Sequence, residues 1–259
     1  MSRPKLLIVN ADDFGFTPDV NQGIVEAHRN GILTAATLMA GGAAFDDAVA
    51  LARETPTLDV GCHLVLVGGM SLAAPGRSLP AGVPQLFSAV ALRRISVYDE
   101  LVAQVEKILG AGLSPTHLDT HKHTHMLPSV ARALARISME YRIEWVRRPL
   151  DLPLAGAYLA ARLRRGGCRM TDHFAGFGLT GRLDKASLAS LIRGLPDGTT
   201  ELMCHPGYHG ASLEVARTRL KASRQRELEA LTSPEARAAI RAAGVQLMDY
   251  RSLPPAVPK

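Results

Sequence analysis

Short apolar runs alternate with helical patterns along this 259-residue chain, and that alternation restricts the fold more than any other feature of the sequence. The candidate strands are largely continuous in apolar character, as is typical of parallel strands covered on both faces. We predict strands at residues 5–10, 34–39, 58–64, 116–120, 143–147, 170–174, 200–204 and 245–249. About eight β–α units in one chain predict an α/β fold, an irregular TIM-like (β/α) barrel that forms a single domain over residues 1–259.

Helical patterns fill the segments between these strands. Thr17 and Pro18 are typical of a helix start, and Gly31 is typical of its end. We expect further helices at residues 46–53, 96–109, 128–142, 184–193, 213–230 and 234–243. The glycine- and proline-rich stretch 68–85 is expected to be a long loop at the mouth of the barrel.

The composition favours a globular protein in a reducing compartment. Hydrophobic residues make up 47% of the chain, but no apolar run reaches the 18 residues that a membrane span needs. The apolar run 6–9 is too short for a signal peptide. The three cysteines have no CxxC spacing, which is typical of reduced thiols. We therefore expect a cytoplasmic protein.

The net charge of +6 and the pI of about 9.5 are compatible with a nucleic-acid partner. However, the basic residues are dispersed along helices and no nucleic-acid-binding motif is present. Aromatic residues make up only 5% of the chain, which leaves little to stack on bases. We expect no nucleic-acid partner, and we interpret the charge as attraction to an acidic surface or as an aid to solubility.

Polar side chains gather at or just after the carboxyl ends of the predicted strands. Residues from several strands converge at that end of a barrel, where active sites lie. The side chains in these positions are Asp12, Asp13, His63, His121 to His125, Arg147, Arg148, His173 and His205.

Four of the nine histidines lie between His117 and His125. If this run were extended, alternate histidines would share a face and stand roughly 6.6 Å apart. Zinc–nitrogen bonds are about 2.0–2.1 Å long, so one ion could not be bound by three of them. One or two histidines would bind metal, the others would contact substrate or support the ligands, and Asp119 could orient a ligand histidine. The alternative is a solvated loop that happens to be rich in histidine.

The Asp12-Asp13 pair offers two carboxylates, one to bind a metal ion and the other to take a proton from water. Its alternative interpretation is a helix cap or a turn. His63, taken alone, is more typical of a hydrogen-bonded core histidine, whereas Pro206 after His205 favours a turn that presents the histidine. The chain has no GxGxxG, P-loop or GxSxG motif. Metal-assisted hydrolysis with general acid–base catalysis is the remaining chemistry.

The combined pattern resembles the YdjC family of carbohydrate deacetylases, and within it most closely the hopanoid-biosynthesis-associated branch, HpnK. The matching segments occur in order along residues 6 to about 250. They are LIVNADDFG (7–15), GILT (31–34), GCHLVL (61–66), PTHLDTHKHTHMLP (115–128) and ELMCHP (201–206). Thr120 stands where other members have serine, and Lys122 stands where some have another histidine.

The resemblance implies an irregular TIM-like barrel and one divalent metal ion, zinc or magnesium. The implied metal ligands are Asp13, His63 and His125. The implied general base is Asp12, and His205 is the candidate general acid. The residues placed at the substrate or behind the ligands are Asp119, His121, His123, Arg147 and Arg148.

The implied reaction removes an acetyl group from an N-acetylated amino sugar and leaves acetate and a free amine. The branch implies an N-acetylglucosaminyl hopanoid lipid as the substrate. The alternatives are a chito-oligosaccharide deacetylase, a metal phosphoesterase or cyclic amidohydrolase, and a non-catalytic barrel that binds a sugar or lipid. The oligomeric state stays open.

The segment 152–165 is apolar and then basic. As a short amphipathic helix it could rest transiently on the anionic inner face of the membrane. An ordinary surface helix is the alternative interpretation of the same pattern.

Overall fold

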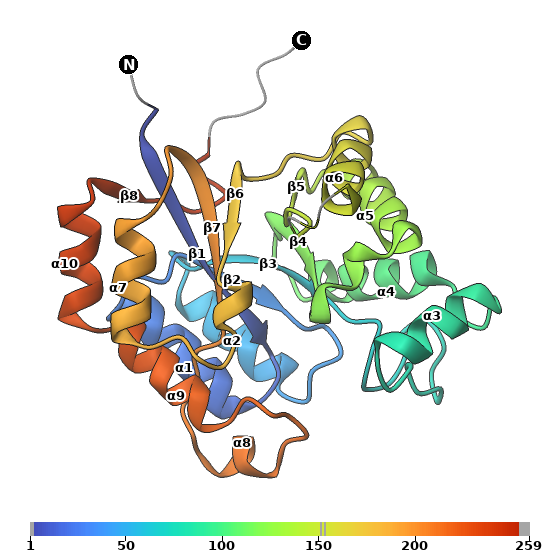
Figure 1. Cartoon of the computed structure of the whole chain (residues 1–259). Coiled ribbons are helices and arrows are strands. Elements are labelled where there is room, and N and C mark those ends of the chain that lie inside the picture. Colours follow the sequence, from blue (N-terminus) through green and yellow to red (C-terminus); the bar gives the residue numbers. More distant parts are fainter. Residues whose placement is uncertain (1–2, 151, 153, 254–259) are drawn as a thin grey trace.

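The computed structural model describes residues 3–150, 152 and 154–253. Its strands form one eight-stranded sheet in the order β5-β4-β3-β2-β1-β7-β6, with β8 paired to β1, and every pairing is parallel. The sheet curls into an open half-barrel, which confirms the predicted single-domain α/β fold of the TIM-like class (Figure 1). The strands are β1 (Lys5–Phe14), β2 (Ala35–Leu38), β3 (Asp59–Leu64), β4 (His117–Thr120), β5 (Trp145–Val146), β6 (His173–Ala175), β7 (Gly198–Cys204) and β8 (Val245–Leu247).

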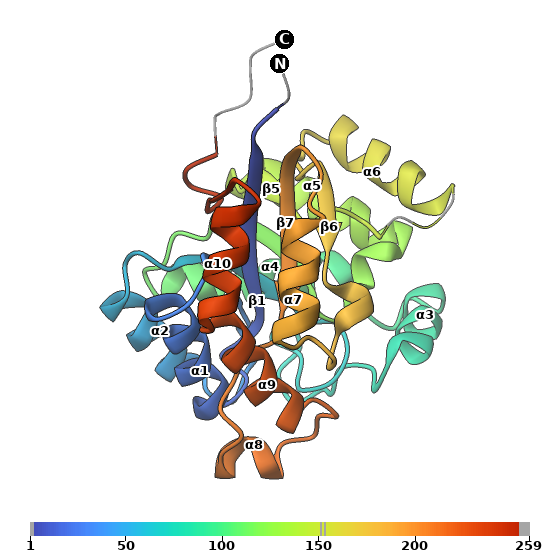
Figure 2. The same cartoon turned by 60° about the vertical axis from the view of Figure 1, so that its left-hand side comes forward.

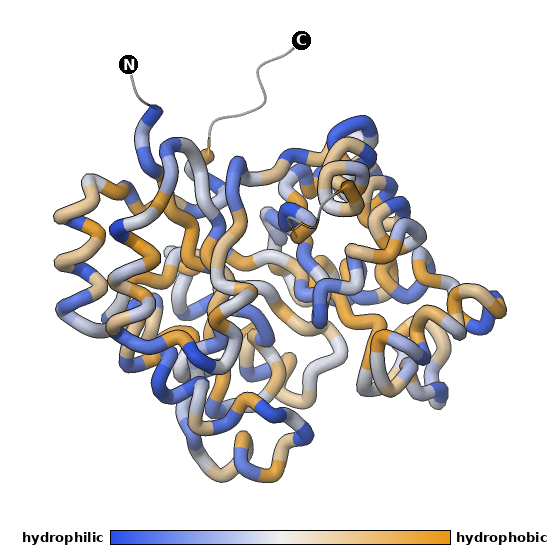
Figure 3. The backbone as a smooth tube through the Cα atoms, in the orientation of Figure 1, coloured by the Kyte–Doolittle hydropathy of each residue, from blue (hydrophilic) through white to orange (hydrophobic). Residues whose placement is uncertain are grey.

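Helices cover the outside of this sheet, and α7 and α10 pack side by side in front of β1 and β7 (Figure 2). Along these outer helices hydrophilic and hydrophobic residues alternate, as expected for helices with one buried face (Figure 3). The helices are α1 (Pro18–Arg29), α2 (Phe45–Glu54), α3 (Val83–Ala91), α4 (Val97–Gly110), α5 (Pro128–Tyr141), α6 (Ala155–Arg165), α7 (Lys185–Arg193), α8 (Ala211–Val215), α9 (Ala222–Leu231) and α10 (Pro234–Ala242), with 3-10 helices η1 (His121–Met126) and η2 (Phe177–Leu179).

The start of α1 is as predicted, because the Thr17 side chain accepts a hydrogen bond from the backbone N–H of Val20 and Pro18 occupies the first turn. The single helix expected over 213–230 is wrong. The chain forms α8, breaks at Ala216 and restarts as α9. The cause is a tertiary contact: the Asp19 carboxylate, on α1, accepts hydrogen bonds from Ser212 Oγ and the Leu213 N–H and so fixes α8 separately.

The stretch 68–85 is mostly loop, as predicted, with a single antiparallel bridge between Met70 and Ser78. The predicted end of this loop at residue 85 is wrong, because α3 begins at Val83 with Pro84 in its first turn. The loop lines the cleft described below. None of the helices in the described ranges is long and apolar enough to cross a bilayer.

The central strand β1 shapes the site. Residues 7–14 of this strand are all buried, between parallel neighbours β2 and β7. The predicted end of the strand at Asn10 is wrong, because pairing continues to Phe14 through a register shift after Ala11. Asp13 lies inside this bulge with φ 69°, in the left-handed region. Such a bulge interrupts the alternation of faces, so the adjacent Asp12 and Asp13 can both face the mouth of the half-barrel.

Candidate active site

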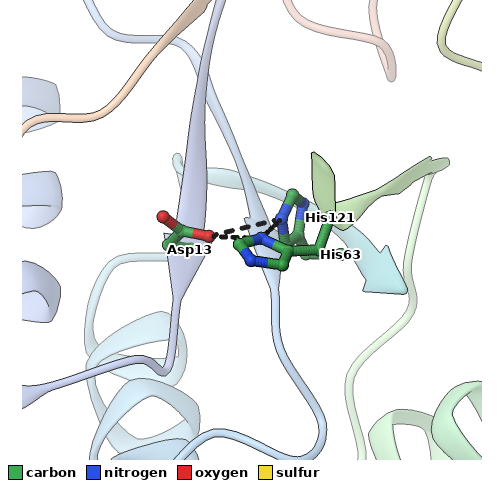
Figure 4. A group of neighbouring side chains, drawn as sticks. All are labelled: Asp13, His63 and His121. Carbon is green, nitrogen blue, oxygen red and sulfur yellow. Dashed lines mark hydrogen bonds and ion pairs between the residues drawn. The ribbon is translucent and has the colours of Figure 1, made fainter. Parts of the chain in front are cut away.

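Three side chains from three strand ends meet at the carboxyl edge of the sheet. Asp13 comes from β1, His63 from β3, and His121 directly follows β4 (Figure 4). His63 Nε2 lies 3.3 Å from Asp13 Oδ1, and His121 Nδ1 lies 3.2 Å from both of these atoms. A tetrahedral ion with bonds of about 2.1 Å separates its ligand atoms by about 3.4 Å. This triangle of one oxygen and two nitrogens therefore has the size that a single divalent ion requires.

Asp13 is oriented so that one of its oxygens faces this triangle. Its Oδ2 is bound by the buried guanidinium of Arg224. Its Oδ1 is buried and faces His63 Nε2 and His121 Nδ1. Burial favours the neutral acid, but Arg224 and the two histidines outweigh it and hold the pKa of Asp13 well below its usual value. A buried anionic oxygen that faces two imidazole nitrogens fits a shared cation.

His63 is fixed by contacts on its far side. Its Nδ1 lies 2.7 Å from Asp119 Oδ1, and the Thr37 hydroxyl donates to the other Asp119 oxygen. Burial lowers the pKa of His63, but the Asp119 carboxylate more than offsets this and the pKa is raised above the ordinary value. Donation from Nδ1 to Asp119 leaves Nε2 free to act as a ligand, the arrangement usual for metal-binding histidines. Asp119 thus holds the ring of His63 from the side of Nδ1.

The histidine run is not extended. It forms η1, in which Lys122 and His123 are left-handed, with φ of 54° and 52°. Thr120 Oγ1 accepts a hydrogen bond from the His125 backbone N–H and lies 2.8 Å from His125 Nδ1. The turn therefore directs His121 to Asp13 and His63 and holds His125 against the end of β4. Among the described residues two close groups of possible ligands occur, Asp13–His63–His121 and Asp12–His63–Asp119, and neither contains the implied ligand His125. The carboxylates of the second group are already bound by Arg147.

Asp12 lies beside this group in a cluster of buried charges. The Arg147 guanidinium donates to both oxygens of Asp12, at 2.7 and 2.9 Å, and also reaches Asp119 and Glu201. Burial raises the pKa of Asp12, but Arg147 more than compensates and holds it well below the usual value. Asp12 is consequently a carboxylate at neutral pH, oriented by two hydrogen bonds from Arg147.

His205 follows β7 and lies near Asp12. Its Nε2 is 3.9 Å from Asp12 Oδ2. Glu227 accepts a hydrogen bond from the backbone N–H of His205, and its carboxylate lies 3.9 Å from His205 Nδ1. Burial raises the pKa of Glu227. The imidazole is therefore placed between two carboxylates, next to the ligand group.

Residues 6–242 match the family model described as YdjC-like protein. The chain belongs to the YdjC-like family. It is 40% identical to a carbohydrate deacetylase of Geobacillus stearothermophilus, over 96% of this chain and 98% of that protein. A carbohydrate deacetylase of Brevibacillus brevis is 36% identical, over 95% and 99% of the two chains. A crystal structure of a putative cellobiose-phosphate cleavage protein from Enterococcus faecalis superposes with a TM-score of 0.82 at 25% identity, over 96% and 98% of the chains.

Of the other residues that the sequence singled out in this YdjC-like chain, His123 lies at the cleft and two do not. His123 lines the cleft, packs edge-on against Phe177, and has its pKa lowered to about 4, chiefly by burial. Arg148 is half-buried and is not among the described residues that line the cleft. His173 was expected at a strand end near the site, which is wrong: it begins β6, and its ring contacts the Asp197 carbonyl.

Sequence reasoning missed three buried charged residues of this YdjC-like site. Arg224 and Glu227 belong to α9, where they read as ordinary helix charges, and Glu201 lies within β7. Each is 1% exposed or less. A charged residue inside an otherwise apolar strand, such as Glu201, is the one signal that could have been used, because buried charges are normally paired.

The YdjC-like site opens into a cleft of about 2030 Å³. Its walls are the loop 68–81, η1 and η2, and the segment from α8 to the start of α9. Asp12, Asp13, His121 and His205 all line it. The volume exceeds the roughly 300–1,000 Å³ of a usual small-molecule pocket, so the cleft has room for a substrate larger than one sugar.

Arg147→Met is expected to destabilise the YdjC-like fold by about 3–5 kcal/mol at neutral pH, because three buried carboxylates lose their common cation. The pKa of Asp12 is lower in the folded than in the unfolded protein. Ionised Asp12 therefore stabilises the wild-type fold above the ordinary carboxyl pKa, and this stabilisation is lost as the pH falls. The deficit of the variant should therefore shrink toward acid pH. Urea unfolding at two pH values measures both effects, with the exposed Arg132→Met as control. A loss below 1 kcal/mol would contradict the assigned role of Arg147.

Proposed function

We propose that this protein is a metal-dependent hydrolase that removes the acetyl group from an N-acetylated amino sugar. The observation that carries the proposal is the triangle of Asp13, His63 and His121 with a carboxylate and an imidazole beside it, at the floor of a wide cleft. The names of the two bacterial relatives, both carbohydrate deacetylases, support the same reaction.

The proposed metal ligands are Asp13, His63 and His121. The geometry supports His121 in place of the His125 that the resemblance implied, because only His121 approaches the other two atoms. One carboxylate with two imidazoles suits zinc and also accepts magnesium. When bound, such an ion polarises the amide carbonyl and lowers the pKa of a water molecule.

The other residues divide the proton transfers. Asp12, a carboxylate at neutral pH, accepts a proton from the attacking water. His205 donates a proton to the amide nitrogen as the C–N bond breaks, so acetate and a free amine leave. Arg147 and Glu227 position Asp12 and His205 respectively. Asp119 fixes the ring of His63, and His123 is placed to contact the sugar.

The proposed substrate is a sugar carried on a larger group, either an N-acetylglucosaminyl hopanoid lipid or a chito-oligosaccharide. The width of the cleft supports both, and Met70, Phe177 and Val215 supply exposed apolar surface at its walls for a lipid. If the substrate is the hopanoid lipid, we propose that residues 152–165 contact the membrane transiently. Leu154 and Tyr158 of this segment are exposed, whereas Leu159 and Leu163 pack inward, and residue 153 lies outside the described residues.

Acetate release from the two substrates tests the proposal. We expect release with the metal-loaded protein, complete loss after dialysis against a chelator, and recovery when zinc or magnesium returns. Mass spectrometry of the lipid and of the chito-oligosaccharide identifies which one loses its acetyl group. A preparation that binds metal but releases no acetate from either substrate would refute the proposed reaction.

A further inference from the structure

Helix α3 leaves part of its apolar face uncovered. Of its nine residues only Leu86 is buried, and Val90 beside it packs partly buried against the core. Val83 and Phe87, which form the neighbouring row of the helix, are 37% and 63% exposed. Leu92, directly after the helix, is 59% exposed. The apolar face of α3 is therefore wider than the surface that the rest of the protein covers.

The helix lies at the edge of the molecule (Figures 1 and 2). Its nine residues are fewer than the roughly 12–15 that an isolated helix needs to be stable in water, so it depends on contacts with another surface. The loop 68–81, which lines the cleft, leads directly into α3 through Gly82. An exposed apolar helix is thus attached to one wall of the cleft.

The loop that leads into α3 is held against α4. The buried carboxylate of Glu100 accepts hydrogen bonds from the Ser71 hydroxyl and from the backbone N–H groups of Leu72 and Ala73. Backbone hydrogen bonds also join the two ends of the loop. Because α3 continues from a fixed loop, any surface that binds α3 is placed beside the cleft.

The exposed charge of this region is entirely positive. No aspartate or glutamate occurs from residue 60 to residue 98, where the exposed charged side chains are Arg77, Arg93 and Arg94. In the part of the chain that the structure describes, none of the three arginines forms an ion pair. Phenylalanine and leucine next to arginines, without acidic residues, are typical of a helix that lies in the interface of an anionic bilayer. Acyl chains complement the apolar row, and negatively charged headgroups complement the arginines.

We propose that α3, with the residues directly after it, is a docking surface for an anionic phospholipid bilayer. Phe87 and Leu92 enter the acyl region, and Arg93 and Arg94 contact the negatively charged headgroups. In this position the loop 68–81 places the cleft beside the bilayer, so a lipid-linked sugar reaches the site without leaving the membrane. The surface is separate in sequence from residues 152–165, and binding to the bilayer does not depend on the proposed reaction.

Co-sedimentation of the full chain with lipid vesicles tests the docking surface without turnover. The protein should bind vesicles of phosphatidylcholine and phosphatidylglycerol more tightly than vesicles of phosphatidylcholine alone. Phe87→Ser/Leu92→Ser should weaken binding to the anionic vesicles roughly tenfold or more, because it removes two apolar side chains from the acyl region. Arg93→Gln/Arg94→Gln should weaken it by about as much, because it removes two positive charges near the lipid surface.

Matched controls separate α3 from the general surface. Met139→Ser removes an exposed apolar side chain of α5, and Arg132→Gln/Arg241→Gln removes two exposed arginines of α5 and α10. Both should leave the affinity for anionic vesicles unchanged. Because the side chains replaced in α3 are exposed and do not line the cleft, the α3 variants should also keep the wild-type unfolding temperature.

Fluorescence measures whether the helix enters the bilayer. Trp145 in β5 is the one tryptophan of the chain, so Phe87→Trp adds a second emitter. Lipids brominated in their acyl chains should quench the added emission and leave that of Trp145 nearly unchanged. Binding without quenching of the added tryptophan would contradict insertion of α3.

Three results overturn the proposal. The first is absence of binding to anionic vesicles, or equal binding by the wild type and both α3 variants. The second is loss of binding in Leu154→Ser/Tyr158→Ser alone, which would assign membrane contact to residues 152–165. The third is a dimer in sedimentation velocity that Phe87→Ser/Leu92→Ser dissociates, without vesicle binding, because α3 would then contact a second copy of the chain. Failure of acetate release with vesicle binding intact would refute only the proposed reaction.

Discussion

Asp12→Asn is expected to lower kcat for acetate release by roughly 10²–10⁴-fold, the contribution typical of a positioned general base. Asparagine keeps the size of the side chain but cannot accept the proton from water. Because both oxygens of Asp12 are bound by Arg147 and Asp12 is not among the proposed ligands, the metal content should stay the same. Steady-state acetate release at saturating substrate, with metal analysis of the same sample, measures both quantities.

The control for this variant is Glu201→Gln, which also removes one carboxylate from Arg147 but does so from within β7. Like Asp12→Asn, this variant removes one negative charge beside Arg147, but it leaves the proposed proton acceptor Asp12 in place. We expect Glu201→Gln to lower kcat far less than Asp12→Asn. Equal losses in the two variants would mean that Asp12 acts only as a partner of Arg147.

The second large effect concerns the metal. His121→Ala should weaken metal affinity by more than about 100-fold, since loss of a direct ligand exceeds the 10–100-fold effect of losing a supporting residue. His125→Ala should keep the metal, because His125 Nδ1 lies against the Thr120 hydroxyl and His125 is not in the close group with Asp13 and His63. Inductively coupled plasma mass spectrometry after dialysis, together with calorimetric titration of zinc, gives occupancy and affinity for each variant.

His125→Ala also provides its own check on folding. The ring is completely buried, so its removal should lower the unfolding temperature by several degrees while the ion remains bound. His121 is partly exposed and its removal should cost little stability in the absence of metal. Loss of metal in His125→Ala together with retention in His121→Ala would restore the ligand set that the family resemblance implied.

The strands could be predicted from the sequence because their apolar runs are local and continuous. All eight exist, and helices with local caps, such as Thr17 before α1, begin where expected. The predictions that were wrong depend on distant contacts. Asp19 separates α8 from α9 although more than 190 residues lie between the partners. No periodicity within residues 213–230 records that contact.

The candidate site, too, was predicted only where local sequence was sufficient. Strand-end positions were sufficient to bring Asp12, Asp13, His63 and His205 into one region, because parallel strands end at a common edge. Strand ends could not predict that His121 approaches Asp13 and His63 while the implied ligand His125 does not join that group, since the path of η1 depends on two left-handed residues. Arg224 and Glu227 were missed because a helix charge carries no local sign that it will be buried.

The bulge at Asp13 has a mechanical consequence. In a regular strand, two side chains on the same face are separated by an intervening residue, and their spacing can change as the strand flexes. Here the ligand candidate Asp13 and the proposed base Asp12 are covalent neighbours, with Cα atoms about 3.8 Å apart across one trans peptide bond. Shifts of β3, β4 or β7 can alter how His63, His121 and His205 approach, but they cannot stretch this peptide. The backbone spacing between the two carboxylate residues is therefore constant, and motion of the strands changes only how closely the three histidines approach them.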